Sequence, residues 1–171
     1  MTETTNEPAG QLHPDYSDPD ATPPPWSVID GVLRDAGIYW LTTTRPTGRP
    51  HTTPVIAVWD GRSVWFCTGP DERKARNLGD RGPCTVTTGC NDYEAGTDVV
   101  VEGDAERVRE PAELARFADA LHAGYGDDWR FDTVADGVEH PAGGVAAVYR
   151  VRADVVFAFT RGPAAQVRYR P

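Results

Sequence analysis

The chain has 171 residues, a length that suits one domain with a single sizeable core. Its formal net charge of -9 and isoelectric point near 4.8 argue against nucleic acid as a partner, because the phosphate backbone binds basic surfaces. The three cysteines include no CxxC pair and do not make a secreted disulfide framework, and no apolar run is long enough to span a bilayer. We therefore expect a cytoplasmic protein with reduced thiols, no nucleic-acid partner and no membrane segment.

Residues 1–25 differ in composition from the rest of the chain. They hold few apolar side chains, are acidic, and end in three consecutive prolines, Pro23 to Pro25. Such a segment buries too little apolar surface to offset the entropy lost on ordering. We expect a disordered or extended tail over 1–25, followed by one cofactor-binding domain over 26–171.

The first part of this domain has the pattern of a helix followed by an antiparallel meander. Apolar residues recur at spacings of three and four over 26–36, which predicts a short helix. Segments 38–44, 52–59 and 63–68 are rich in β-branched or aromatic residues and are predicted strands. The Asp60-Gly61 pair between the last two favours a tight hairpin.

The second part continues with alternating helices and strands. The sequence predicts a helix over 70–80, strands over 85–88 and 97–108, a helix over 111–124, and an alternating last strand within 145–160. Some six strands at short spacing with three helices between them indicate an antiparallel barrel with the helices outside it. The fold class is therefore mainly β.

The segment VWFCTGPDERKARNL, residues 64–78, has the layout of an anion-binding site. A strand leads into a Gly-Pro turn and a helix start, where backbone N–H groups lack partners and attract negative charge. Arg73 can bind phosphate oxygens in a bidentate manner, Lys74 adds a compact charge, and Thr68 can donate its hydroxyl. These three side chains could surround one phosphate.

Other interpretations of the same residues stay open. The basic residues of this helix could pair with Asp71, Glu72 or Asp80 on a solvated surface. His51 could be a surface histidine at the start of a strand, and Cys67 a small core residue. His122 and His140 show no metal-like spacing with Cys or His, and neither a serine nucleophile elbow nor a GxGxxG turn occurs. We predict no metal site.

The segment WLTTTRPTGRPHTTPVIAVWDGRSVWFCTGPDERKARNL, residues 40–78, resembles the flavin-binding half of pyridoxamine 5'-phosphate oxidase-like proteins. The resemblance is sharper to the actinobacterial branch that uses the deazaflavin coenzyme F420, in which G-R-P-H, W-D-G, C-T-G-P and R-K-A-R-N-L motifs follow in this order. With the later segments TDVVVEGDAERV and VYRVRADVVFAF, the similarity covers about residues 26–171. A composition rich in Ala, Gly, Asp and Arg, with Lys74 as the single lysine, agrees with an actinobacterial source.

This resemblance implies a split β-barrel of the FMN-binding type, a six-stranded antiparallel Greek-key-like barrel. It also implies a homodimer with the cofactor groove at the subunit interface. The residues that it places at the cofactor are Arg73 and Lys74 on the phosphate; Cys67, Thr68 and Gly69 near the chain that leads to it; His51, Thr52, Thr53, Pro54 and Val55 along the ring; and Asn77 as a weaker candidate.

The implied activity is hydride transfer between coenzyme F420 and a small electron-poor organic substrate. An FMN-dependent oxidoreductase of the same family is the alternative, because FMN also needs one phosphate site. A second alternative is a flavin, deazaflavin or haem binding protein without turnover. No catalytic residue is assigned. Tyr93, Tyr125 and Trp129 could shape a substrate pocket or donate a proton, or could equally pack in the core or at an interface. A second, substrate phosphate has only Arg168 and Arg170 as candidates.

Overall fold

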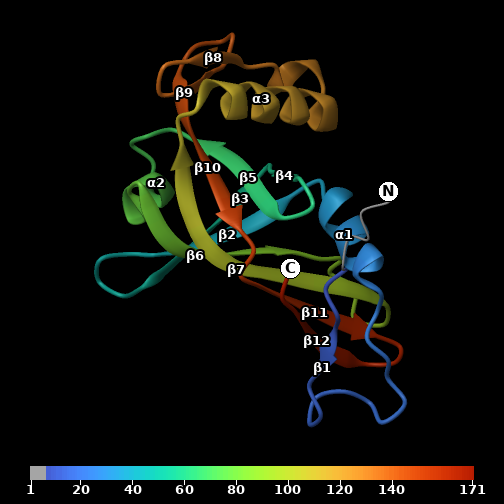
Figure 1. Ribbon diagram of the computed structural model, residues 1–171. Helices are drawn as coiled ribbons and strands as arrows, with labels where there is room; N and C mark the ends of the chain where they lie inside the picture. The colour runs from blue at the N-terminus through green and yellow to red at the C-terminus, as the bar shows by residue number, and fades with distance from the viewer. Residues whose placement is uncertain (1–6) are drawn as a thin grey trace.

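A computed structural model describes residues 7–171 of the chain (Figure 1). Its helices are α1 (Trp26–Arg34), α2 (Arg73–Leu78), α3 (Pro111–Tyr125) and a short 3₁₀ helix η1 (Asp127–Trp129). Its strands are β1 (Gln11–Leu12), β2 (Tyr39–Thr44), β3 (Pro50–Val55), β4 (Val58–Trp59), β5 (Ser63–Thr68), β6 (Arg81–Thr88), β7 (Gly96–Val108), β8 (Asp132–Val134), β9 (Gly137–Glu139), β10 (Val145–Arg152), β11 (Val155–Arg161) and β12 (Ala165–Tyr169). None of the helices within this range is long and apolar enough to cross a membrane.

The long strand β7 organises an antiparallel sheet. Its first half pairs with β11 and its second half with β10, while β6 pairs along its other edge. From there the sheet continues through β6 to β2 and β3, and through β10 to β5 and β4. Side chains of β2, β5, β6, β7 and β10 meet in one interior, with Leu41, Phe66, Val86, Val101 and Tyr149 among them. The predicted mainly β, split-barrel fold is confirmed.

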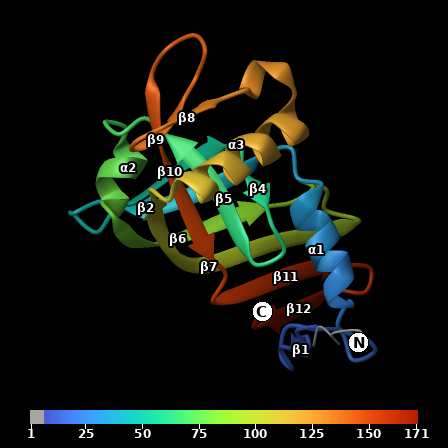
Figure 2. The same cartoon turned by 45° about the horizontal axis from the view of Figure 1, so that its top comes forward.

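Helix α3 forms a second layer outside the barrel (Figure 2). Alternate residues of a strand face opposite sides of a sheet, and on β5 Phe66 packs in the barrel while Trp65 packs beneath α3. Leu114, Phe117 and Leu121 of α3 complete this smaller cluster. Helix α3 therefore covers the side of β5 and β10 that faces away from the barrel core.

Residues 7–171 contain twelve strands where the sequence predicts about six, because two predicted strands are divided and four short ones were not foreseen. Segment 145–160 is two strands, since the chain turns at Ala153 and Asp154. The Ala153 N–H donates to the Arg62 carbonyl at 3.1 Å and the Asp154 N–H to the Glu102 carbonyl at 2.9 Å. Segment 52–59 is likewise interrupted, between β3 and β4.

Helix α2 is shorter than the predicted helix over 70–80. The Glu72 N–H donates to the Gly69 carbonyl at 3.1 Å, which closes a turn over Pro70 and Asp71 before the helix begins at Arg73. The helix ends at Leu78, and Gly79 follows with a φ of 59°. The basic residues therefore lie at the start of a six-residue helix.

Residues 7–25 of the predicted tail lie against the C-terminal strand, whereas residues 1–6 are outside the described part of the chain. Strand β1 pairs with β12, and the Asp18 carboxylate accepts the Ala164 N–H at 2.8 Å. The Tyr169 hydroxyl donates to the Pro24 carbonyl at 2.7 Å, and Ala21 is buried in the main core. Because these contacts are mostly polar and involve the backbone, the low apolar content of the segment did not reveal them.

Candidate functional site

The turn between β5 and α2 forms a cradle for an anion. We define the anion cradle as Thr68, the Gly69 N–H and Lys74. In this structure the Glu72 carboxylate lies in it: Oε1 accepts the Gly69 N–H at 3.0 Å, and Oε2 contacts Lys74 Nζ. A side chain at Gly69 would place its Cβ 3.3 Å from Glu72 Oε1, so the glycine leaves room for the anion.

The surroundings of the Glu72 carboxylate stabilise a negative charge at this point. Lys74 is buried, with 8% of its surface exposed, although it is the residue type most often found in solvent. Its ammonium group holds the pKa of Glu72 below its usual value, aided by the Gly69 N–H and the Thr68 hydroxyl and opposed by burial. Arg73, the neighbour of Lys74 in the sequence, is exposed, and the hydrogen bonds to the Glu72 carboxylate come from Gly69 and Lys74 instead. These donors fit a phosphate group.

A second group of polar atoms lies where α2 meets β2 and β3. Asn77 Nδ2 donates to Thr43 Oγ1 at 2.9 Å, and Thr43 lies opposite His51 in the β2–β3 pair. Asn77 Oδ1 and His51 Nδ1 are buried and have no hydrogen-bond partner among the described residues. An unsatisfied buried polar atom costs about 1 to 3 kcal/mol. The two atoms are therefore suited to polar groups of a bound molecule.

Strand β3 is an edge strand, which pairs with β2 alone among the described residues. Its prolines agree with this place, because proline in a sheet is confined to edges and bulges. His51 and Thr53 are half-buried and Val55 is buried, whereas Thr52 and Pro54 are exposed on the outer face. The outer backbone edge of β3 therefore has no strand partner within residues 7–171.

Cys67 does not contribute its side chain to the anion cradle. It packs with the cluster beneath α3, on the opposite side of β5 from Phe66. Burial, and to a smaller extent the charge of Glu72, raises the pKa of its thiol to about 12, so the thiol stays protonated.

The aromatic candidates for a substrate pocket are placed differently from one another. The Tyr125 hydroxyl donates to the Ala57 carbonyl at 2.9 Å and accepts its N–H at 3.2 Å, so it joins α3 to the loop between β3 and β4. Tyr93 is 88% exposed, and Trp129 packs against other aromatic rings near the end of α3. Arg168 contacts Gln11 on β1. None of these side chains is brought to the anion cradle.

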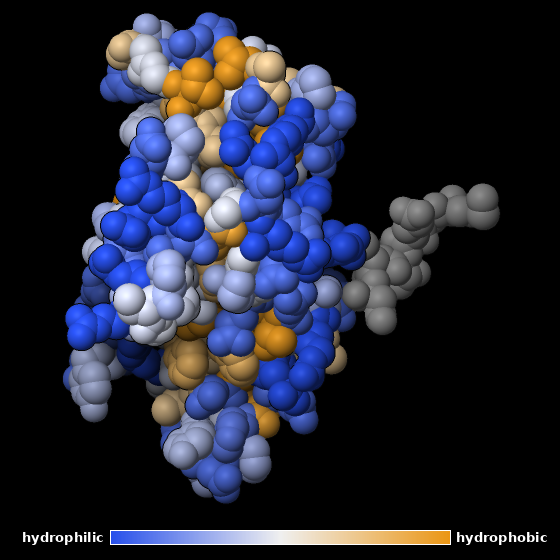
Figure 3. All heavy atoms as spheres, turned by 90° about the vertical axis from the view of Figure 1, so that its left-hand side faces the viewer, coloured by the Kyte–Doolittle hydropathy of each residue, from blue (hydrophilic) through white to orange (hydrophobic). Residues whose placement is uncertain are grey.

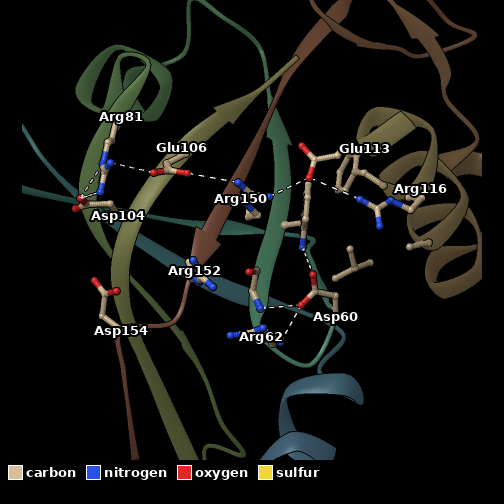
Figure 4. A pocket seen from close by; sticks show the side chains of 15 residues that line it. Asp60, Arg62, Arg81, Asp104, Glu106, Glu113, Arg116, Arg150, Arg152 and Asp154 are labelled. Atoms are coloured by element: carbon tan, nitrogen blue, oxygen red, sulfur yellow. Dashed lines mark hydrogen bonds and ion pairs between the residues drawn. The ribbon is translucent and has the colours of Figure 1, made fainter. Parts of the chain in front are cut away.

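A cavity of about 700 Å³ lies elsewhere, between α3 and the outer face of the barrel (Figure 4). None of the predicted cofactor residues lines it. Its arginines and acids form a chain of ion pairs, from Arg81 with Asp104 at 3.0 Å and Glu106 at 3.1 Å to Arg150 with Glu113 at 2.9 Å. Because five arginines and five carboxylates line it, the cavity has no formal excess of either charge.

Metal binding has no candidate within residues 7–171, where no three His, Cys, Asp or Glu side chains stand together. Asp127 instead contacts His122 at 2.8 Å and Arg130 at 3.3 Å. These partners, His122 first, hold the pKa of the Asp127 carboxyl below its usual value. The three residues form a surface cluster at the end of α3.

Sequence reasoning missed two features of the site. Thr43 was not foreseen, although the turn around Gly48 would have paired it with His51. Glu72 was foreseen as a neighbour of the basic residues, but not as the group that occupies their cradle. Both features depend on side-chain placement across the turn and the hairpin.

Comparison with known proteins places the chain in a family. The family model described as pyridoxamine 5'-phosphate oxidase matches residues 26–158. No curated protein matches in sequence.

Solved structures share the fold at low sequence identity. A conserved hypothetical protein from Mycobacterium tuberculosis is 22% identical with a TM-score of 0.65, covering 88% of this chain and 89% of its own. The FAD binding protein from Mycobacterium smegmatis is 19% identical with a TM-score of 0.56, covering 85% of this chain and 94% of its own. A pyridoxamine 5'-phosphate oxidase-related, FMN binding protein from Nostoc punctiforme is 14% identical with a TM-score of 0.59, covering 87% of this chain and 92% of its own. The fold and the family-model match together show that the chain belongs to the pyridoxamine 5'-phosphate oxidase family.

Proposed function

We propose that this protein is an oxidoreductase that binds coenzyme F420 and transfers a hydride between it and a small electron-poor organic molecule. The observation that carries the proposal is the anion cradle, where Gly69 and Lys74 already hold a carboxylate. A cofactor phosphate presents oxygens of the same charge and hydrogen-bonding capacity. Arg73, the neighbour of Lys74 in the sequence, adds a second positive charge.

The ring of the cofactor is proposed to lie along β3. His51 Nδ1 and Asn77 Oδ1 offer one polar atom each, and the edge of β3 offers backbone groups. When bound, the deazaflavin supplies the hydride chemistry, and the protein orients the ring and excludes water. No side chain is assigned as a proton donor.

Two observations bear on the choice of cofactor. The order of motifs in residues 40–78 supports F420. FMN is the second candidate, because a protein of the same fold from Nostoc punctiforme is described as FMN binding. A protein that binds either cofactor without turnover would be a carrier and not an enzyme.

We further propose that two copies of the chain pair through the outer face of the sheet, with the cofactor groove between them. Paired residues place Pro54, Trp40, Thr87, Val100 and Phe157 in one row across β3, β2, β6, β7 and β11. Trp40 is 47% exposed, which is high for so large an apolar side chain. On the side of the molecule seen in Figure 3, apolar residues form a band between polar ones.

The decisive experiment is a fluorescence titration of the purified apoprotein with F420 and with FMN. We expect F420 to bind more tightly than FMN, Lys74→Met to weaken binding at least about tenfold, and Arg73→Ala to weaken it less. Arg76→Ala is the matched control, because Arg76 is on the same helix, is exposed, and its guanidinium forms an ion pair only with Asp71, at 3.8 Å, among the described residues. Preferential binding of FMN would favour the flavoenzyme, and binding of neither cofactor would refute the proposal.

Turnover and assembly need separate measurements. Mixing the protein and reduced F420 with conjugated enones and quinones should oxidise the cofactor; a bound cofactor that is never oxidised would indicate a carrier. Light scattering during serial dilution should show the dimer dissociating as the cofactor is released, because binding at an interface is linked to assembly. A monomer that retains the cofactor would contradict the interfacial groove.

A further inference from the structure

The contacts of Glu72 place an anion of the protein itself in the proposed phosphate site. Its two carboxylate oxygens use the Gly69 N–H and the Lys74 ammonium, the same donors that a phosphate would need. Glu72 is the one carboxylate within 4 Å of Lys74 Nζ in the described part of the chain. A phosphate and this carboxylate therefore cannot both use the full set of donors.

The Glu72 side chain is able to leave the anion cradle. It is 53% exposed, whereas the Lys74 side chain is 10% exposed, so the acid lies on the solvent side of the pair. Its backbone immediately precedes α2 in an extended conformation and is held by the turn, which leaves the side chain free to rotate outward. Lys74 would remain in place and meet the incoming anion.

We infer that Glu72 is an internal competitor for the anion cradle, which a phosphate must displace, and that it selects phosphodiesters over phosphomonoesters. The inference rests on the proposed function, whose cofactor it helps to choose. A displaced Glu72 stays tethered a few ångströms away and repels the ligand in proportion to its charge. A phosphomonoester such as FMN carries about -1.5 to -2 at pH 7, whereas the phosphodiester of F420 carries a single negative charge at its phosphate.

The neighbouring acid Asp71 provides a matched control. It precedes Glu72 directly and carries the same charge, but its side chain is 96% exposed and its recorded contact is with Arg76 at 3.8 Å. Asp71→Asn therefore changes the net charge as Glu72→Gln does and leaves the cradle intact. Comparison of the two variants separates competition in the cradle from a general change of charge.

The test measures dissociation constants of inorganic phosphate by ³¹P NMR, and of FMN and F420 by fluorescence, for the wild type, Glu72→Gln and Asp71→Asn. A unit charge a few ångströms away in partly solvated surroundings changes affinity by roughly tenfold. Glu72→Gln should therefore bind F420 about tenfold more tightly and FMN more tightly by a larger factor, whereas Asp71→Asn should change each constant by less than about threefold. Glu72→Ser serves as a second variant should the glutamine variant fold poorly.

The outcomes separate this inference from the proposed function. Equal phosphate affinity in the wild type and Glu72→Gln, an equal gain in Asp71→Asn, or no phosphate binding in any variant would overturn the competition. Equal gains for FMN and F420 would overturn the selectivity. If phosphate binds more tightly to Glu72→Gln alone while neither cofactor binds any variant, the result supports the competition between Glu72 and phosphate and contradicts the proposed function.

Discussion

The Tyr149 hydroxyl donates a hydrogen bond of 2.9 Å to the carbonyl of Gly79, the residue that follows α2. Tyr149 lies in the barrel, 2% exposed, and its ring stacks on Phe66 with centroids 5.4 Å apart. Burial raises the pKa of the hydroxyl, which keeps it protonated as a donor. The end of the helix that carries Lys74 is thus attached to a side chain of the barrel core.

Substitution of Tyr149 by Phe should lower the free energy of unfolding by about 1 kcal/mol, because one hydrogen bond is lost and the Gly79 carbonyl loses its partner. Urea denaturation followed by tryptophan fluorescence would measure the change. Tyr93→Phe is the control and should have no effect, since Tyr93 is 88% exposed. Equal stability of the wild type and Tyr149→Phe would show that this bond does not hold α2.

Asn77→Leu tests whether the polar atoms beside α2 serve a ligand or the fold. The change removes the bond to Thr43 at 2.9 Å, but it also removes the unpartnered Oδ1 atom. These effects oppose each other, so we expect the free energy of unfolding to change by less than about 1 kcal/mol. The affinity for F420 should fall about tenfold, since a ligand group loses its partner. A large loss of stability with unchanged affinity would assign Asn77 to the fold.

The local sequence pattern was sufficient to predict those helices and strands in which the pattern runs without a break. Strand β5 and helix α3 were predicted almost residue for residue, because apolar alternation and helical spacing run through each without a break. The turn between β10 and β11 was missed, because Ala153 and Asp154 carry no glycine or proline signal. Two further short strands, 132–134 and 137–139, lie in a stretch without periodicity.

The candidate site likewise has one part that a contiguous sequence segment predicted and another part that depends on contacts between distant residues. Residues 64–78 contain the whole anion cradle, so a contiguous segment was enough to predict that Thr68 and Lys74 lie together. The contact between Asn77 and Thr43 joins residues 34 positions apart and depends on how α2 docks on β2. The identity of the cradle's occupant depends on a side-chain rotamer, for which the sequence has no signal.

Thiol labelling tests the burial of the cysteines. Cys90 is exposed, whereas Cys67 and Cys84 have pKa values of about 12, raised mainly by burial. The thiolate is the reactive form, and at pH 8 only roughly one in ten thousand such groups is ionised. Iodoacetamide should therefore label the native protein once between pH 7 and 9, at Cys90, and three times after denaturation, as mass spectrometry would show. Labelling of native Cys67 would contradict its place beneath α3.

The contact between Arg150 and Glu113 should contribute a measurable coupling free energy to the attachment of α3 to the barrel. Arg150 Nη1 lies 2.9 Å from Glu113 Oε1, its guanidinium lies over the Trp65 ring at 5.4 Å, and the two charged side chains are 33% and 25% exposed. Partial burial reduces screening by solvent, so a double-mutant cycle with Arg150→Met and Glu113→Gln should give a coupling of about 1 kcal/mol. The control cycle pairs Glu113 with Arg116, which lies at 3.6 Å and is 74% exposed. The coupling between Glu113 and Arg116 should be less than about 0.3 kcal/mol, because an exposed pair is hydrated and screened.

Equal couplings in the two cycles would show that burial at the barrel surface adds nothing to the attachment of α3.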